Sequence, residues 1–383
     1  MFRTQAAFCQ SVIDLHCDSV KFLSEGVDLL ARNKAGHVDL PRLRAGGVGV
    51  QVFAAFVSAS LPADRAFSTA LALLDRIDAF AESSAYLVSA RTAAECREAI
   101  ASGKTGILRS VENGSAIEDS LANLEALSRR GVRILTLVHS RHTAWAASCT
   151  DYSVFSFGKP SGEPSFRGGG LSAFGKDVVA AMNSLGMIID LSHAAEIAFW
   201  DVINLSKRPV IASHSCAYSL CAAARNLKDE QIKALAGAGG LVGVCFFPAF
   251  LSEAYRLAFE SDCGDIFSEI SFIEKKYTGS PALHAEYSRL DSRLASRLSR
   301  VRVPLSAVAD HIDYIVSLGG EDCVALGSDF DGVFSLPEGM GGCDVYPAIE
   351  KELKKRGYSE KSLAKIFREN FLRVLAEHDG PAP

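Results

Sequence analysis

The chain has 383 residues, of which 48% are hydrophobic and 22% charged, and its formal net charge at pH 7 is -5. This composition is typical of a soluble globular protein and excludes a disordered or fibrous chain. No cluster of lysine and arginine marks a nucleic-acid surface, so we expect no nucleic-acid partner. Residues 1–11 lack the apolar core of a signal peptide, and no later run could span a bilayer, which predicts a cytoplasmic protein without membrane contact.

Eight short apolar runs, rich in β-branched residues, alternate along the chain with segments of helical periodicity. Eight buried strands separated by helices indicate an α/β protein with a (β/α)8 TIM-type barrel. We therefore interpret residues 1–383 as a single barrel domain. The runs cover residues 12–18, 48–57, 106–111, 132–137, 187–191, 209–212, 241–247 and 324–329.

Helices are predicted between these runs from apolar residues spaced three or four apart. The clearest cover residues 63–82, residues 172–185 with a stop at Gly186, and residues 359–377, which we expect to close the barrel. Thr92 and Glu95 form a capping-box pattern that opens another helix. Residues 251–302, between the seventh and eighth runs, are helix-prone but too polar for a barrel core. This insertion is interpreted as a lid or an oligomer contact.

Metal-binding residue types follow one strand after another. His16 and Asp18 are two residues apart, so in a strand they project from the same face. A histidine at the end of a strand is by itself more often structural than functional, but the carboxyl ends of TIM-barrel strands all meet at one mouth. The complete set at strand ends is His16, Asp18, Glu112, His139, His193, His214 and Asp329.

Three of these histidines together with two of these carboxylates already exceed the three protein ligands of a mononuclear catalytic zinc site. The sequence therefore favours a two-metal centre in which Glu112, alone on its strand, is the bridge. Mixed imidazole and carboxylate ligands suit zinc, although cobalt or manganese could occupy the same positions. His142 is open between a pocket residue and a solvated loop residue. The histidines expected to lie away from the strand ends, in structural roles, are His37, His284, His311 and His378.

Over nearly its whole length the chain resembles the membrane or renal dipeptidase family of zinc metallopeptidases (peptidase family M19), because several separate blocks occur in the right order. The blocks are Asp14-x-His16-x-Asp18, Glu112-Asn113-Gly114, Leu135-Thr136-Leu137-x-His139, Asp190-Leu191-Ser192-His193, Ser213-His214-Ser215, Arg225-Asn226, Phe247-Pro248-Ala249-Phe250-Leu251 and Gly327-Ser328-Asp329-Phe330-Asp331-Gly332.

The resemblance implies two zinc ions per chain, one held by His16 and Asp18, the other by His193 and His214, with Glu112 as the bridge. It also implies substrate-binding and catalytic roles for His139, Arg225 and Asp329, and it suggests a homodimer of the soluble bacterial type. The sequence departs from mammalian members after Glu112, which have more glycine and a further histidine there, and at His142. These departures leave the metal centre intact and affect the expected substrate preference.

The expected activity is hydrolysis of dipeptides, including ones with a D-residue at the second position, by a metal-bridging hydroxide. In this mechanism Asp329 shuttles the proton, His139 stabilises the oxyanion, and Arg225 holds the substrate's terminal carboxylate. One alternative is a metal-dependent amidohydrolase acting on another small amide, an N-acyl amino acid or a lactone. The other is a catalytically silent barrel that acts as a binding or scaffold protein.

Overall fold

A computed structural model describes residues 11–59, 61–150, 169–277 and 282–380. Almost all of the segment used to exclude a signal peptide lies outside these ranges. Within them, no helix combines the length and the apolar character that crossing a membrane would need.

Eight parallel strands of the described chain close into a barrel, as the sequence predicts. The order is β1-β2-β4-β5-β6-β7-β8-β9, and β9 pairs with β1 through Asp14 and Leu326 to complete the ring. Nearly every strand residue is buried, which explains why the strands read as continuous apolar runs. The strands are β1 (Val12–Cys17), β2 (Val48–Phe56), β4 (Thr105–Glu112), β5 (Val132–Thr136), β6 (Ile188–Asp190), β7 (Ile211–Ser215), β8 (Leu241–Val244) and β9 (Val324–Leu326).

A ninth strand, β3 (Leu87–Ser89), was not predicted; it pairs with the first residues of β4, outside the ring. The predicted helix caps are confirmed. Thr92 and Glu95 form a capping box, and Gly186 ends its helix with φ 66°. The helices around the barrel are α1 (Val20–Ser24), α2 (Leu40–Ala45), α3 (Ala66–Glu82), α4 (Ala93–Ala101), α5 (Leu121–Arg129), α6 (Ala173–Leu185), α7 (Glu196–Leu205), α8 (Asp229–Gly237), α13 (Ser306–Gly319) and α14 (Tyr346–Lys355).

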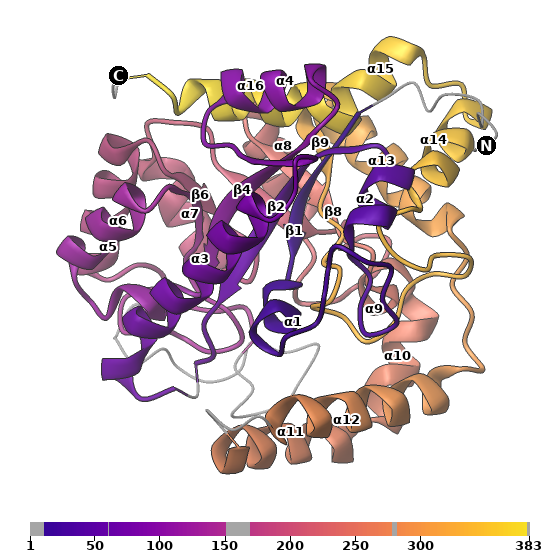
Figure 1. The fold of residues 1–383 in the computed structure, drawn as a ribbon, viewed down its shortest axis with the longest axis horizontal. Coiled ribbons are helices and arrows are strands. Elements are labelled where there is room, and N and C mark those ends of the chain that lie inside the picture. Colours follow the sequence, from indigo (N-terminus) through magenta and orange to yellow (C-terminus); the bar gives the residue numbers. More distant parts are fainter. Residues whose placement is uncertain (1–10, 60, 151–168, 278–281, 381–383) are drawn as a thin grey trace.

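The inside of the barrel is a cluster of aliphatic side chains to which every barrel strand contributes, such as Leu15 from β1 and Leu108 from β4. The C-terminal helix joins this cluster through Phe371 and Leu375, so it closes the amino-terminal end of the barrel as expected. The helical segment consists of α15 (Glu360–Ala364), a π-helical turn (Lys365–Glu369) and α16 (Asn370–Glu377). Figure 1 shows α16 beside α4 at this end.

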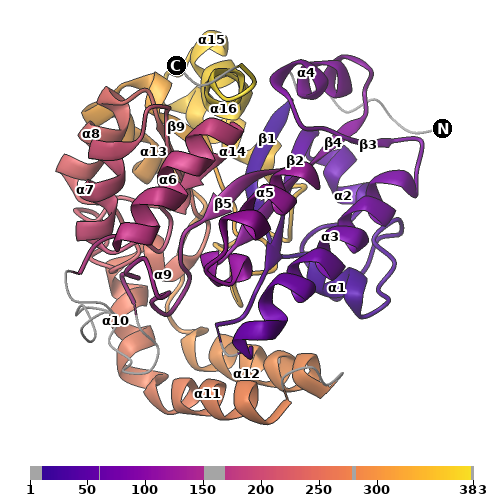
Figure 2. The ribbon, with the colours of Figure 1, turned by 90° about the vertical axis from the view of Figure 1, so that its left-hand side faces the viewer.

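The insertion is helical, as predicted, and follows the short helix α9 (Pro248–Leu251). It contains α10 (Glu253–Asp262), α11 (Gly264–Tyr277) and α12 (Ala282–Leu298). In Figures 1 and 2 the pair α11 and α12 lies beyond the end of the barrel to which β1 points, opposite α16. The insertion therefore lies on the side of the barrel where the carboxyl ends of the strands meet.

Candidate metal centre

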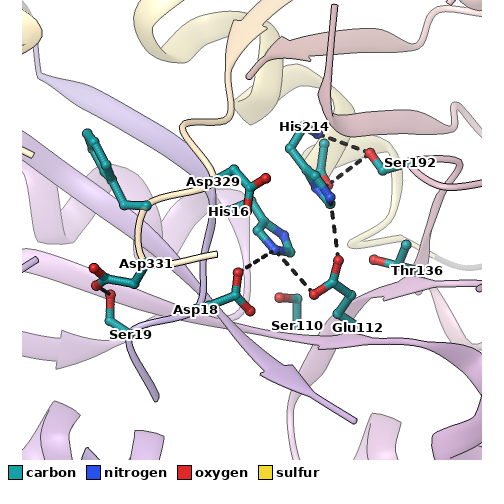
Figure 3. Close-up of polar contacts among 12 residues, drawn as sticks. His16, Asp18, Ser19, Ser110, Glu112, Thr136, Ser192, His214, Asp329 and Asp331 are labelled. Carbon is teal, nitrogen blue, oxygen red and sulfur yellow. Dashed lines mark hydrogen bonds and ion pairs between the residues drawn. The ribbon is translucent and has the colours of Figure 1, made fainter. Parts of the chain in front are cut away.

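Glu112, the last residue of β4, lies at the centre of the carboxyl-end mouth and divides its two oxygens between two groups of side chains. Its Oε2 is 3.6 Å from His16 Nε2. Its Oε1 is 3.2 Å from His193 Nε2 and 3.4 Å from His214 Nε2. Figure 3 shows Glu112 reaching toward both His16 and His214. One carboxylate oxygen for each side is the arrangement expected of a bridging ligand.

The remaining strand-end residues complete the two sides. Asp18 Oδ2 is 3.5 Å from His16 Nε2, as their i, i+2 spacing predicts. Ligand atoms of His16, Asp18 and Asp329 all lie within 4.8 Å of one another, and so do those of Glu112, His139 and His193. All seven strand-end residues of the sequence analysis are thus brought to one mouth.

Burial and mutual charge shift the protonation of this cluster. Burial would lower the pKa of His16, but Glu112 and Asp18 raise it well above its usual value. Burial and the nearby charges of Arg225 and His139 hold the pKa of His193 well below its usual range. Burial and the charge of His16 lower the pKa of His214 to about 3. His193 and His214 are therefore neutral, which is the form of imidazole that binds metals.

Two buried side-chain atoms of a kind that binds metals indicate that the cluster fits a cation. In the part of the chain described, Asp18 Oδ1 has no hydrogen-bond partner, and His16 Nε2 has only ion-pair contacts of 3.5 and 3.6 Å, too long for good hydrogen bonds. Buried polar atoms are almost always paired, because leaving one unpaired costs about 1 to 3 kcal/mol. A metal ion between the imidazoles and carboxylates would satisfy both atoms. The donor set of three imidazoles and two carboxylates suits zinc or a similar divalent ion.

Left-handed backbone occurs at two of the strand-end residues and directly after a third. His193 has φ 69° and Asp329 has φ 62°, and Asn113, directly after Glu112, has φ 88°. Such conformations are uncommon for residues other than glycine and cluster at functional sites, where the surrounding structure holds them. Here the Cys149 N–H donates to the carbonyl of His193 at 2.8 Å, which fixes the turned backbone.

A second layer of buried carboxylates supports the histidines, and the sequence analysis assigned it no role. Asp14, two residues before His16, accepts hydrogen bonds from Ser328 N at 2.8 Å and Ser328 Oγ at 2.6 Å. Asp190, three residues before His193, accepts from Ser213 N at 2.8 Å and Ser213 Oγ at 2.6 Å. The available signal was an aspartate two or three residues before His16 and before His193, with a serine at the end of a neighbouring strand.

Arg225 lies buried beside the centre, in the loop after β7. Its Nη2 donates to the carbonyl of His214 at 3.1 Å, and its guanidinium lies 5.3 Å from the Phe250 ring centroid. None of the carboxylates in the described ranges forms an ion pair with it. A buried arginine that lacks a counter-ion among these residues can bind an anionic group.

The loop after β5 places two more histidines near the mouth. The His139 ring contacts those of Phe56 and His193, with centroids 4.7 Å and 4.3 Å away, so His139 lines the mouth as predicted. His142 is partly buried, and its Nδ1 accepts from Ser148 N–H at 2.9 Å. It is therefore not a solvated loop side chain: it holds the loop that carries His139.

The expectation that His37 lies away from the strand ends is wrong. Its Nδ1 accepts from the Asp331 N–H at 3.1 Å, and the Asp331 carboxylate accepts from Ser19 and from the His37 N–H. Asp331 thus ties two loops together in the turn directly after Asp329. His311 and His378 bond to backbone groups of Leu251 and Pro209 respectively, and the side chain of His284 lies outside the description.

Comparison with known proteins identifies the family. Residues 5–380 match the profile of membrane dipeptidase (peptidase family M19). The chain is 29% identical to Dipeptidase 3 of Mus musculus over 93% of its length and 30% identical to Dipeptidase 3 of Macaca fascicularis over 89%. It spans only 61% and 58%, respectively, of those relatives.

Two solved structures are similar over almost their full length. The crystal structure of the metallopeptidase called dipeptidase AC is 28% identical, with a TM-score of 0.77, and the match covers 96% of this chain and 98% of that one. A metallopeptidase from Rhodobacter sphaeroides, liganded with a phosphinate mimic of the dipeptide L-Ala-D-Ala, is 26% identical with a TM-score of 0.77, and 96% of this chain and 99% of that one are covered. With its barrel and its clustered metal-ligand side chains, the chain belongs to the membrane dipeptidase family, peptidase family M19.

Proposed function

We propose that the chain is a zinc-dependent dipeptidase with two metal ions at the mouth of one barrel domain. The observation that carries this proposal is Glu112, whose two oxygens face separate sets of ligand residues. His16 and Asp18 would hold one ion, His193 and His214 the other, and Glu112 both. Metal ions bound there supply Lewis acidity and lower the pKa of a bound water from about 15.7 to about 7.

Two residues of the chain would then act on the reacting peptide bond. Asp329 takes the proton of the attacking water and returns it to the leaving amine. It lies with His16 and Asp18, which together with Glu112 would already give one ion three protein ligands. His139 donates a hydrogen bond to the carbonyl oxygen as that oxygen gains negative charge. Its contact with His193 places it beside the second ligand set.

The substrate class follows from Arg225 and from the relatives. The buried guanidinium, which has no acidic partner among the residues that the structure describes, would hold the C-terminal carboxylate of a short peptide, one residue beyond the bond that is cleaved. The Rhodobacter sphaeroides relative binds a mimic of L-Ala-D-Ala, which supports a dipeptide, with a D-residue accepted at the second position. A homodimer and a cytoplasmic location complete the proposal, with residues 251–302 as a lid or an oligomer contact.

A substrate panel tests this function. Chelator-treated enzyme, reloaded with zinc, is assayed on L-Ala-L-Ala, L-Ala-D-Ala, tri-alanine, N-acetyl-Ala-Ala and a lactone. We expect both free dipeptides to be hydrolysed and the metal-free enzyme to be inactive. The tripeptide and the acetylated peptide should react at least about 30-fold more slowly, which is on the order of the loss of one charge-assisted contact. Preference for the acetylated peptide or the lactone would instead indicate the broader amidohydrolase. Bound zinc without turnover of any compound would indicate a binding protein.

A further inference from the structure

Two further side chains form a hydrogen-bonded chain that supports the His214 ring at its Nδ1. Its Nδ1 lies 2.7 Å from Ser213 Oγ, which in turn lies 2.6 Å from Asp190 Oδ2. Asp190, Ser213 and His214 are each at most 1% exposed. No comparable support exists for His193, whose buried Nδ1 has no hydrogen-bond partner in the described ranges.

The protons in this chain of bonds can be placed from the donors around Asp190. Its Oδ1 accepts from Ser192 N at 3.0 Å and from Ser213 N at 2.8 Å, and its Oδ2 accepts from Thr136 Oγ1 at 2.7 Å. An ionised carboxylate only accepts, so the single hydroxyl proton of Ser213 goes to Oδ2. Ser213 Oγ can then only accept from His214. The neutral His214 ring therefore carries its proton on Nδ1.

The opposite ring nitrogen faces the centre. His214 Nε2 is 3.4 Å from Glu112 Oε1 and 3.0 Å from His193 Nε2. With the proton on Nδ1, the lone pair of Nε2 is free for a ligand. The backbone of Ser213 is also closely packed, because a Cβ added at Gly327, directly after β9, would lie 1.7 Å from its carbonyl oxygen.

We propose that Asp190 is a positioning residue which, through Ser213, holds His214 in the Nδ1–H tautomer and so keeps Nε2 available to a metal ion. The inference rests on the metal-ligand role proposed for His214. It adds that the tautomer of this ligand is determined by the Asp190 carboxylate, which contacts neither metal nor substrate.

The hydrogen-bonded chain from Asp190 through Ser213 to His214, called the relay here, predicts that substitutions at Asp190 and Ser213 lower zinc affinity in an unusual order. Asp190→Asn keeps an oxygen for the two backbone donors but turns an amide NH2 toward Ser213 Oγ. Ser213 must then accept from Asn and donate to His214 Nδ1, which moves the imidazole proton to Nε2 and blocks the metal. Ser213→Ala only cuts the relay and leaves the ring free to choose its tautomer. Loss of support for a metal-bound histidine typically costs about 10-fold to 100-fold in affinity.

The test measures zinc affinity by competition with a chromophoric chelator. Ser213→Ala is expected to lose about 10-fold, Asp190→Asn about 100-fold, and the double variant to return to the Ser213→Ala value. Thr136→Val is the matched control, since it removes another bond to the same Asp190 oxygen and leaves the relay intact. A double variant as weak as Asp190→Asn, or weaker, would mean that Asp190 merely holds the fold and would overturn the proposal.

Nitrogen-15 NMR of the histidine rings in metal-free enzyme gives an independent readout. The His214 signals, assigned by their loss in His214→Ala, should show a protonated Nδ1 in wild type and a protonated Nε2 in Asp190→Asn. A wild-type ring protonated at Nε2 contradicts the relay, and this reading is available even if Asp190→Asn fails to fold. If His214→Ala keeps full zinc affinity, the ligand assignment fails instead, while the ring tautomer still decides the relay.

Discussion

His193 Nε2 lies 3.0 Å from His214 Nε2, and both nitrogens face the same oxygen of Glu112. Two imidazoles around one tetrahedral zinc, with Zn–N bonds of about 2.0 to 2.1 Å, place their nitrogens roughly 3.4 Å apart. The pair is therefore already close to the spacing that a single ion requires. Since His16 faces the other oxygen and Asp18 lies 3.5 Å from His16, a second ion would have ligands of its own.

Metal content is the first prediction. Zinc-loaded wild type should contain about two equivalents per chain by elemental analysis. His193→Ala should lose about one equivalent, because it removes a ligand from one side only. Asp329→Asn should keep both ions. Saturation of the fully active wild type at one equivalent would contradict the two-metal assignment.

Asp329 and Asp331 form a matched pair for the second prediction, since both are aspartates of the same loop with left-handed backbone, φ 62° and 69°, the first partly buried and the second buried. Asp329→Asn should lower kcat about 10² to 10⁴-fold, the usual contribution of a general acid-base group, with an unchanged melting temperature. Asp331→Asn should lower the melting temperature while kcat of the folded enzyme is retained, because Asp331 holds Ser19 and His37 N–H. The same loss of stability in both variants would make Asp329 a structural residue.

The third prediction concerns Arg225 and the substrate carboxylate. Removing one partner of a buried, hydrogen-bonded charge pair costs about 2 to 5 kcal/mol, or about 30-fold to a few thousand-fold in kcat/KM. Amidation of the dipeptide C-terminus should cost wild type this much. Arg225→Met should cost about as much on the free acid and little more on the amide, because the same bond is removed. Equal rates of wild type on acid and amide would rule out carboxylate recognition by Arg225.

A fourth prediction concerns Gly332, whose backbone lies close to the carboxylates of Asp18 and Asp329 in the loop after β9. A Cβ on Gly332 would lie 2.1 Å from Asp329 Oδ1 and 2.3 Å from Asp18 Oδ2, so Gly332→Ala should displace both groups and lower zinc affinity and kcat together. At Gly341, in the same loop, a Cβ would meet nothing within 4 Å, and Gly341→Ala should behave as wild type. Wild-type zinc binding in Gly332→Ala would show that the two carboxylates can move without loss.

Stability should fall in mild acid partly through His311, which is 1% exposed. Its Nδ1 accepts from the Ala217 N–H, and burial lowers its pKa to about 4. The unfolded chain has the ordinary histidine pKa of about 6.5 and binds the proton first, so the stabilising contribution is complete above pH 6.5 and is lost as the pH falls toward 4. The shift of about 2.5 pKa units corresponds to roughly 3 kcal/mol.

His311→Gln removes this titration. Its free energy of unfolding should lie below that of wild type at pH 7.5, and the gap should narrow steadily between pH 6.5 and pH 4.5 in urea titrations of the metal-free proteins. A gap that is constant with pH would show that His311 does not titrate in this range.

The barrel was predictable because parallel strands buried on both faces leave continuous apolar runs. The clustering of the candidate ligands was predictable because these residues end those runs, and the carboxyl ends of barrel strands meet at one mouth. The three residues of β3 are too few to give a pattern, and its outer end is exposed. The π-helical turn before α16 leaves the apolar spacing of residues 359–377 nearly unchanged, so periodicity does not detect it.

The second layer around the metal centre was harder to predict for a different reason. Asp14 and Asp190 were visible in the motifs, but their function depends on partners that only the fold supplies. Ser328 is 314 residues from Asp14. His37 was misplaced for the same reason, since its contact with Asp331 spans 294 residues. Local sequence patterns locate the strand ends, but they do not show which distant loops contact those ends in the fold.

The bonds from Ser328 to Asp14 join the last barrel strand to the first, whereas Asp190, Ser213 and His214 lie on neighbouring strands. A nascent chain leaving the ribosome therefore contains the complete His193 and His214 side of the centre first. Ser328 follows His214 by roughly 110 residues, or on the order of ten seconds at about 5 to 20 residues per second. We expect ordered uptake during biosynthesis, with the ion beside His16 and Asp18 retained only after the ring of strands has closed.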